Sequence, residues 1–390
     1  MDIHGYDKKY EAAINAIKDG DLSASNKELI LKFHGDLVLE SLSKPRLINY
    51  LNKLKLLAKR LNKDFDKVSK DDIKELVSGI QQQTYSGWTK QTYKVMLRRF
   101  YVWFERPELV DWINIRISRS EQKLPSEGDL LIEEEVQKLI KLADHPRNKA
   151  LVSMLWESGA RISELGNICI KNVVFDKHGL VLSISGKTGS RKIRLIASTP
   201  HLSTWLNVHP AKDDPSAPVW INFGNRRQNQ GMVYPAMCKM LRDLFKKAGM
   251  KKRSNPHLFR HSRATFMANH LTEFQMNQYF GWIQGSKMPS TYVHMSGKAV
   301  DSAILKMNGI EVESDKELVQ ERPRVCPRCD TINSYDSKHC NKCGGILDLK
   351  YAMEMDTERK HADDMMAKML EDPKIKELFF ERLKELKGVF

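Results

Sequence analysis

Apolar residues in the first 110 positions recur at intervals of three and four, which is the period of an amphipathic helix. The stripes follow residues that suit helix starts, such as Ser43 and Ser69. This spacing predicts four helices joined by short polar turns, and therefore a compact helical bundle with these positions in its core. The apolar positions are Leu29, Ile30, Phe33 and Leu37; Leu47, Ile48, Leu51, Leu54, Leu57, Ala58 and Leu61; Ile73, Leu76, Val77 and Ile80; and Tyr93, Met96, Leu97, Phe100, Trp103 and Phe104.

The pattern changes beyond this bundle. Pro107, Pro125 and Gly128 interrupt the helical period, so we expect a linker here, followed by a second domain of mixed helical and alternating segments. The boundaries are a helical domain at 1–110, a linker at 111–127 and a second domain at 128–310. Within the second domain, helical spacing covers 133–142, 149–157, 233–248 and 271–280, and alternation covers 180–184, 192–196 and 218–223.

The remaining residues are strongly charged. They divide into a charged linker at 311–324, a cysteine-rich segment at 325–348 and a tail at 349–390. One apolar stripe follows Pro373 in the tail, which predicts a helix that either folds on its own domain or docks onto a neighbouring protomer. The stripe consists of Ile375, Leu378, Phe379, Leu383 and Leu386. The patterns together predict a multidomain, mainly α protein.

The cysteine-rich segment holds Cys326, Cys329, Cys340 and Cys343 as two C-x-x-C pairs separated by ten residues. Each pair directs two thiolates to one point, and four thiolates make a closed tetrahedral site for a structural Zn²⁺. The segment resembles a zinc ribbon. A redox pair or a coincidental grouping is the alternative, and His339 is a further candidate ligand.

Composition narrows the class of partner. The net charge is +15 and the pI is near 9.4, which favours a polyanion, with nucleic acid ahead of an acidic membrane. Among the basic residues, Lys53, Lys55, Lys59, Arg60, Lys63, Lys90, Lys94, Arg98 and Arg99 lie between the apolar stripes of the bundle. No run of eighteen apolar residues and no apolar signal core occur, so we expect a cytoplasmic protein with no membrane partner.

Residues 255–296 contain the densest candidate chemistry. Asn255 and Pro256 suit the cap and first position of a helix, and His257 and Arg260 then project from the same face. A helix start offers free amides and a positive dipole end. An imidazole and a guanidinium directed at one anion there suit a phosphodiester better than a hydrophobic core.

The segment HLFRHSRAT resembles the His-x-x-Arg motif of the tyrosine recombinase (integrase) family, and Tyr292 occupies the position of that family's nucleophile. The stretch SGARISEL resembles its first arginine motif, with Arg161 and Glu164 in register. Lys187, in a hairpin turn bounded by Gly186 and Gly189, matches its catalytic lysine. Trp282, ten residues before Tyr292, stands where the family usually has a histidine. A tryptophan can donate one hydrogen bond but cannot titrate, so it would position rather than transfer a proton.

The resemblance implies a fold and a mechanism. The helical bundle corresponds to a SAM-like core-binding domain and the second domain to the α+β catalytic domain. Arg161 and Arg260 would hold the phosphate, His257 would take the proton from Tyr292, and Lys187 would protonate the leaving 5′-oxygen. A 3′-phosphotyrosyl intermediate stores the bond energy, so catalysis needs no cofactor, neither ATP nor a metal.

The implied partners are double-stranded DNA with paired half-sites and further copies of the chain, from a dimer to a tetramer on DNA. Exchange of C-terminal segments in such assemblies favours docking of the tail onto a neighbour. The ribbon and the lysine-rich composition suggest an archaeal or mobile-element branch of these recombinases.

Several alternatives remain at this point. Tyr279 is a rival nucleophile, although its helical setting favours packing. His257 and His261, four apart, could share a metal, but no third ligand is evident, and His261 more simply packs or bonds to backbone. A type IB topoisomerase would use the same chemistry without a preferred site, and a catalytically silent DNA-binding or architectural protein would use none of it.

Overall fold

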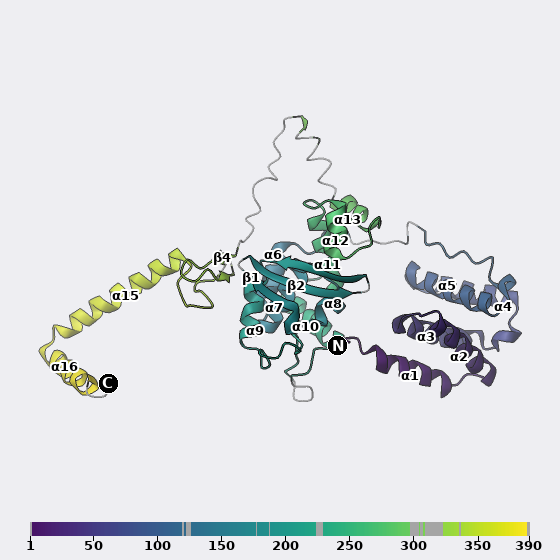
Figure 1. Ribbon diagram of the computed structural model, residues 1–390, viewed down its shortest axis with the longest axis horizontal. Helices are drawn as coiled ribbons and strands as arrows, with labels where there is room; N and C mark the ends of the chain where they lie inside the picture. The colour runs from purple at the N-terminus through teal and green to yellow at the C-terminus, as the bar shows by residue number, and fades with distance from the viewer. Residues whose placement is uncertain are drawn as a thin grey trace. The chain divides into compact units, whose positions relative to one another are not determined.

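The computed structural model divides the chain into two compact units. One consists of Met1–Asp129 with Met232–Met237, and the other of Leu130–Gly231 with Cys238–Phe390. Each unit has its own buried apolar residues, and Figure 1 shows the helices and strands of both. The residues that the structure describes are 2–118, 121, 126–176, 178–186, 188–223, 229–296, 304, 307–308, 323–334 and 337–387.

The first unit is the helical bundle that the apolar spacing predicts. Serine side chains at 23, 69 and 86 cap three of its helices by accepting a backbone N–H from the first turn. Most of the predicted apolar positions are buried in one core, with Phe33, Phe65 and Phe100 at its aromatic centre. The helices are α1 (Tyr6–Lys18), α2 (Ala24–Leu39), α3 (Lys44–Leu61), α4 (Lys70–Gln82) and α5 (Gly87–Trp103).

Helix α1 is an addition to the four helices expected. Its Ala13 and Ile17 are buried, and Tyr10 and Ile14 pack against the same core, so four positions at helical spacing face inward. Its cap, Gly5, offers no side-chain oxygen to the first turn. The start of α1 therefore lacks the serine signal that marks α2, α4 and α5.

Basic residues of this bundle also make contacts within it. The Lys53 ammonium lies 3.8 Å from the centre of the Tyr93 ring, and Arg60 donates to the Tyr85 hydroxyl at 2.9 Å. Arg99 pairs with Glu40 and donates to the Tyr50 hydroxyl. These residues therefore help to hold the bundle surface, and contact of that surface with DNA stays a prediction.

The larger part of the second unit is built around α7. Every residue from Ala150 to Ser158 in this helix is buried, and α6, α9 and α11 pack against it. The helices that the sequence predicts at 133–142, 149–157, 233–248 and 271–280 are confirmed, with small shifts at their ends. The helices of this region are α6 (Glu133–Leu142), α7 (Pro146–Ser158), α8 (Ile162–Gly166), α9 (Thr199–Asn207), α10 (Tyr234–Lys247), α11 (Pro256–Met267), α12 (Glu273–Phe280) and α13 (Met288–Ser296).

One antiparallel sheet, in the order β1-β2-β3, lies against α7 and α8 (Figure 1). The two predicted strands are confirmed as β2 (Gly179–Gly186) and β3 (Gly189–Leu195), which pair from Leu180↔Leu195 to Gly186↔Gly189. The strand β1 (Val173–Asp176) was not expected, because only one of its residues is even partly buried. The prediction of a strand at 218–223 is wrong, because Pro218 and Ile221 make only isolated bridges.

The cysteine-rich segment has two short antiparallel strands, β4 (Arg324–Val325) and β5 (Ile332–Asn333). The tail that follows is helical as expected, in two helices, α15 (Leu349–Leu370) and α16 (Pro373–Lys387). Nearly all of the charged segment at 311–324 lies outside the described residues. Among the helices described, none combines the length and the apolar composition needed to cross a membrane.

Candidate active site

Arg161 is held at the start of a helix. Gly159 ends α7 with φ 53°, and a Cβ there would stand 2.6 Å from the Phe280 ring, so glycine is required for both conformation and space. Arg161 is then the N-cap of α8: its backbone N–H donates to the Glu164 carboxylate at 3.0 Å. Its guanidinium donates to the same carboxylate at 2.8 Å and remains 31% exposed. The side chain is therefore anchored at one edge and open at the other.

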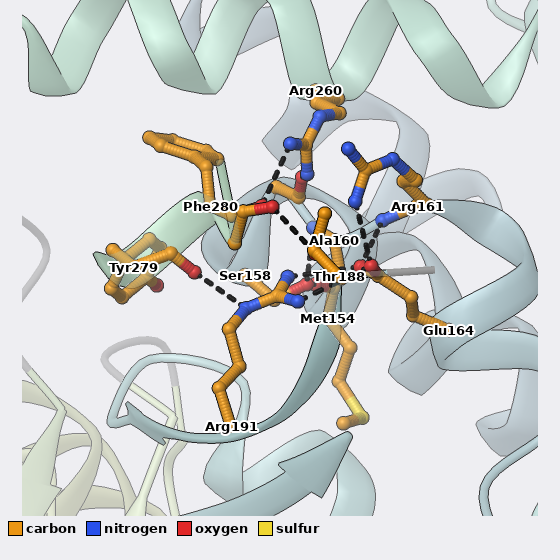
Figure 2. A network of polar contacts seen from close by, with 12 residues as sticks. Met154, Ser158, Ala160, Arg161, Glu164, Thr188, Arg191, Arg260, Tyr279 and Phe280 are labelled. Atoms are coloured by element: carbon orange, nitrogen blue, oxygen red, sulfur yellow. Dashed lines mark hydrogen bonds and ion pairs between the residues drawn. The ribbon is translucent and has the colours of Figure 1, made fainter. Parts of the chain in front are cut away.

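Glu164 is the centre of a polar network shown in Figure 2. Its side chain is 1% exposed and also accepts two hydrogen bonds from Arg191 of β3, at 3.2 and 2.9 Å. Burial opposes ionisation of Glu164, but Arg191 and Arg161 outweigh it and hold the pKa of the carboxyl below its ordinary value. Arg191 in turn donates to the Tyr279 carbonyl at 2.8 Å. The network thus ties α8, the β2–β3 hairpin and the end of α12 together.

Arg260 reaches the same region from α11. The residue is 4% exposed, and its two terminal nitrogens donate to the carbonyls of Gly159 and Phe280, each at 2.9 Å. These two bonds use two of the five guanidinium N–H groups. Burial lowers the pKa of Arg260 to about 10, and the positive charge of Arg161 adds to this effect, so the group is still protonated at neutral pH. Its orientation is fixed by backbone rather than by a carboxylate.

Positive charge is in excess at this point of the structure. The positive charges of Arg161 and Arg191 act on Arg260, and Glu164 is the carboxylate that faces all three guanidinium groups. Among the described residues, no carboxylate lies within ion-pair distance of Arg260. A buried cation without a counter-charge is unfavourable. The cluster is therefore suited to an anion that would lie against the exposed edge of Arg161.

Tyr292 lies on α13 with its ring 2% exposed. Trp282 stacks on it with ring centres 5.4 Å apart and an angle of 3° between the planes, which fits the positioning role expected for Trp282. The hydroxyl is 2.8 Å from Nδ1 of His261 on α11. Burial raises the pKa of Tyr292 above its ordinary value, while the positive charges of Arg260 and Arg161 lower it in part. The phenol is therefore held near the cluster in its protonated form.

His257 and Lys187 are the two remaining residues of the predicted catalytic set. His257 is in the first turn of α11 and is exposed, with its ring centre 5.9 Å from that of His261. Partial burial of its ring, then the charges of Arg260 and Arg161, lower its pKa, so its imidazole is neutral at pH 7. Lys187 lies outside the described residues, between the ends of β2 and β3. Thr188 next to it donates to the Gly281 carbonyl at 2.8 Å.

Tyr279, the rival nucleophile, has a structural setting. Its hydroxyl donates to the Glu157 carbonyl at 2.9 Å, and burial raises its pKa to about 12. Glu157 is itself buried, and its carboxylate accepts from the backbone and hydroxyl of Ser198. Tyr279 is thus engaged in packing the end of α12 against α7.

Sequence reasoning missed two members of the site. Arg191 shares a face of β3 with the buried Ile193 and Leu195, and this alternation is a signal that its guanidinium points inward toward a partner. The sequence predicts that His261 packs or bonds to backbone, whereas its ring bonds to the Tyr292 hydroxyl. Their separation of 31 residues left no local pattern to indicate that contact.

The four cysteines meet at one point. Their sulfur atoms all lie within 4.8 Å of one another, with Cys326–Cys343 at 3.6 Å and Cys329–Cys340 at 3.5 Å. A tetrahedral Zn²⁺ site with metal–sulfur bonds of about 2.3 Å places its sulfurs about 3.8 Å apart. Burial disfavours the Cys340 thiolate, but backbone N–H groups of the second knuckle lower its pKa to about 6. The group can hold a metal ion of this kind.

Comparison with known proteins finds a family and several relatives that this chain resembles. Residues 130–298 match the phage integrase family. The chain is 25% identical over 289 residues to tyrosine recombinase XerA of Pyrococcus horikoshii, covering 73% of this chain and 95% of the relative. It is 26% identical over 271 residues to tyrosine recombinase XerD of Ralstonia nicotianae, covering 66% and 86%.

Solved structures support the same fold. A complex of XerH with a palindromic difH substrate after cleavage has a TM-score of 0.58 at 17% identity, covering 77% of this chain and 89% of that one. A lambda integrase dimer on a COC′ core site has a TM-score of 0.53 at 14% identity, covering 68% and 76%. Residues 130–298 therefore form a domain that matches the phage integrase family, and the chain is similar to tyrosine recombinases over most of its length.

Proposed function

We propose that this protein is a site-specific DNA recombinase, or integrase, that cuts and rejoins DNA through a 3′-phosphotyrosyl intermediate on Tyr292. The observation that carries the proposal is the excess of buried positive charge beside a buried tyrosine. Arg161 and Arg260 face one carboxylate, Glu164, and the charges of both act on the Tyr292 phenol. A scissile phosphate between the arginines and the phenol would supply the missing negative charge.

The chemistry follows from these groups. The Tyr292 oxygen attacks phosphorus in line, its proton passes to a histidine of α11 as the O–P bond forms, and the bond to the 5′-oxygen breaks on the opposite side. Negative charge grows on the non-bridging oxygens, where Arg161 and Arg260 donate forked hydrogen bonds. Neutral His257, an exposed residue in the first turn of α11, donates a further hydrogen bond to the phosphate. Trp282 keeps the phenol ring in its plane.

The leaving oxygen needs a proton, and Lys187 is the proposed donor because the β2–β3 hairpin that carries it is anchored beside Glu164 and Gly281. Attack of the free 5′-hydroxyl on the phosphotyrosine reverses the step. The phosphodiester energy is kept in the covalent bond, so the reaction consumes no ATP and uses no catalytic metal. The cysteine site, which we propose holds Zn²⁺, is closed by four protein ligands and is structural.

The partners proposed are double-stranded DNA with paired half-sites and other copies of this chain. Exchange of strands needs cuts in two duplexes, and therefore several active sites in one assembly. Similar solved structures include a lambda integrase dimer bound to a core site and a lambda integrase tetramer bound to a Holliday junction. Those assemblies support the same arrangement for this protein.

A nicked linear duplex that loses its 5′-fragment after cleavage traps the intermediate and tests the proposal. The duplexes would contain a randomised central segment, and covalent adducts would be isolated on a denaturing gel and sequenced. The wild type is expected to form adducts that share a sequence. Tyr292→Phe is expected to shift DNA without forming an adduct, whereas the matched control Tyr279→Phe keeps adduct formation. An adduct that persists in Tyr292→Phe would refute the assignment.

A further inference from the structure

The hydroxyl of Tyr292 has a protein partner that the family resemblance did not assign. Nδ1 of His261 is 2.8 Å from this oxygen, and the two ring centres are 5.9 Å apart. Among the described residues, the structure gives this hydroxyl no second hydrogen-bond partner. Because Tyr292 is 2% exposed and covered by Trp282, bulk water does not have free access to its proton. His261 is thus the group placed to exchange a proton with the phenol.

The protonation state of His261 follows from its surroundings. Burial of His261, then the proximity of His257 and the charge of Arg260, lower the pKa of its imidazole below the ordinary 6.5. The ring is therefore neutral at pH 7. A neutral ring can accept the phenol proton at Nδ1 while it carries its own proton on Nε2. In this tautomer the Tyr292 hydroxyl donates to His261.

The other titratable groups near this pair leave His261 as its base. On the adjoining α7 and α12, Glu157 binds the backbone at 196–198, and the Tyr279 hydroxyl donates to a carbonyl. Neither group bonds to His261 or Tyr292. The charged and titratable groups that act on the pair are His257 and Arg260 from α11 and Arg161 from the start of α8.

Building on the recombinase function proposed above, we propose that His261, rather than His257, is the general base that removes the proton from Tyr292. As the tyrosine oxygen bonds to phosphorus, its O–H bond breaks and the proton passes to Nδ1 of His261, giving an imidazolium. The 5′-oxygen leaves on the far side of phosphorus with a proton from Lys187. On rejoining, the imidazolium returns its proton to the departing phenolate. Protons and electron pairs balance in both directions.

The cationic surroundings limit how long that imidazolium persists. Arg260 and His257 disfavour a positive charge on His261 before DNA binds. A phosphate bound between Arg161 and Arg260 brings negative charge to the same place and makes protonation of His261 easier. The base would therefore become effective when the scissile phosphate is in position.

A first experiment needs no DNA. Fluorotyrosine would be placed at position 292 of the full chain, and its fluorine NMR shift would be followed against pH. We expect a step below pH 6.5, the ordinary pKa of histidine, as His261 is protonated and its bond to the phenol changes. The step should vanish in His261→Asn, which keeps an acceptor oxygen near the Nδ1 position, and persist in His270→Asn, an exposed histidine beyond the end of α11.

A second experiment measures adduct formation on the nicked duplex in a single turnover. We expect His261→Asn to be slower by about 10²- to 10⁴-fold, the usual contribution of a general base, and to lose the acidic limb of the pH profile. A more acidic difluorotyrosine at position 292 should recover part of this loss, because a weaker base then suffices. A histidine that only packs against Tyr292 would give no such recovery.

The outcomes separate this inference from the recombinase function itself. A fluorine signal without the low-pH step in the wild type overturns the inference, whatever happens with DNA. So does a His261→Asn variant with an unchanged rate, or one slowed without any change in pH profile and without recovery by difluorotyrosine. If the step is present but the wild type forms no adduct, the proposed function is refuted while the proton-exchanging pair stands.

Discussion

Removal of Arg191 tests whether the network around Glu164 holds the active site together. The substitution Arg191→Met keeps a long side chain but removes two hydrogen bonds to the Glu164 carboxylate and one to the Tyr279 carbonyl. The Glu164 side chain is 1% exposed and that of Arg191 is 11% exposed, so water does not replace the lost partner readily. Arg161 remains as the second partner of the carboxylate.

The expected cost follows from these contacts. Hydrogen bonds to charged groups contribute about 1.5–3 kcal/mol each, and removal of one partner from a buried ion pair costs about 3–5 kcal/mol. Because Glu164 retains Arg161, we expect a loss of roughly 3–5 kcal/mol in the free energy of unfolding of the catalytic region. With a denaturant slope of about 2–3 kcal/mol per molar urea, the midpoint should fall by roughly 1–2.5 M.

Urea unfolding followed by tryptophan fluorescence measures this change, since the buried Trp205 and Trp220 report on the same unit. The matched control is Arg194→Met on the same strand. Arg194 makes a two-pronged pair with Asp176, but their side chains are 43% and 36% exposed, so little change is expected. Equal midpoints for the two variants would refute the reasoning about the buried network.

Three further predictions concern other parts of the chain. Metal analysis should find zinc in the wild type and less or none in Cys326→Ser, because three thiolates no longer close the site; equal zinc content in both would contradict this prediction. The melting temperature should fall as pH drops below about 6.5, because the buried His209 and the half-buried His34 and His261 have lowered pKa values and the unfolded chain then binds more protons; a flat profile between pH 7 and 5 would oppose this. Trp282→Phe should retain adduct formation through ring stacking, whereas Trp282→Ala should lose about 3–5 kcal/mol of stability and most activity. Equal stability and equal adduct formation in the two variants would exclude the stacking role.

The elements with strong periodic patterns could be predicted from the sequence. The stripes of α2 to α5 and the alternation of β2 and β3 each reflect one buried face, so their period alone gives the element. The strand β1 is nearly all exposed and α1 begins without a side-chain cap, so neither offers the usual signal. Pro218–Phe223 is mostly apolar and its centre is buried, yet only isolated bridges form there. Apolar character alone does not distinguish such bridges from a strand.

The residues of the site also divide into those that the sequence predicts and those that it does not. Arg161, Arg260 and Tyr292 stand in motifs with fixed spacing, and the structure brings the two guanidinium groups and the phenol into one region. The partners of these residues come from elsewhere in the chain: Arg191 lies 27 positions from Glu164, and His261 lies 31 from Tyr292. Such contacts depend on how β3 packs on α8 and how α13 packs on α11. Spacing within a motif carries no information about that packing.

Peptide mapping of the trapped protein–DNA adduct by mass spectrometry identifies the residue that carries the covalent bond to DNA. After nuclease digestion, we expect a nucleotide attached through its 3′-phosphate to the hydroxyl of Tyr292. Attachment to Tyr279 or to any other residue, or a 5′-phosphate linkage at Tyr292, would contradict it.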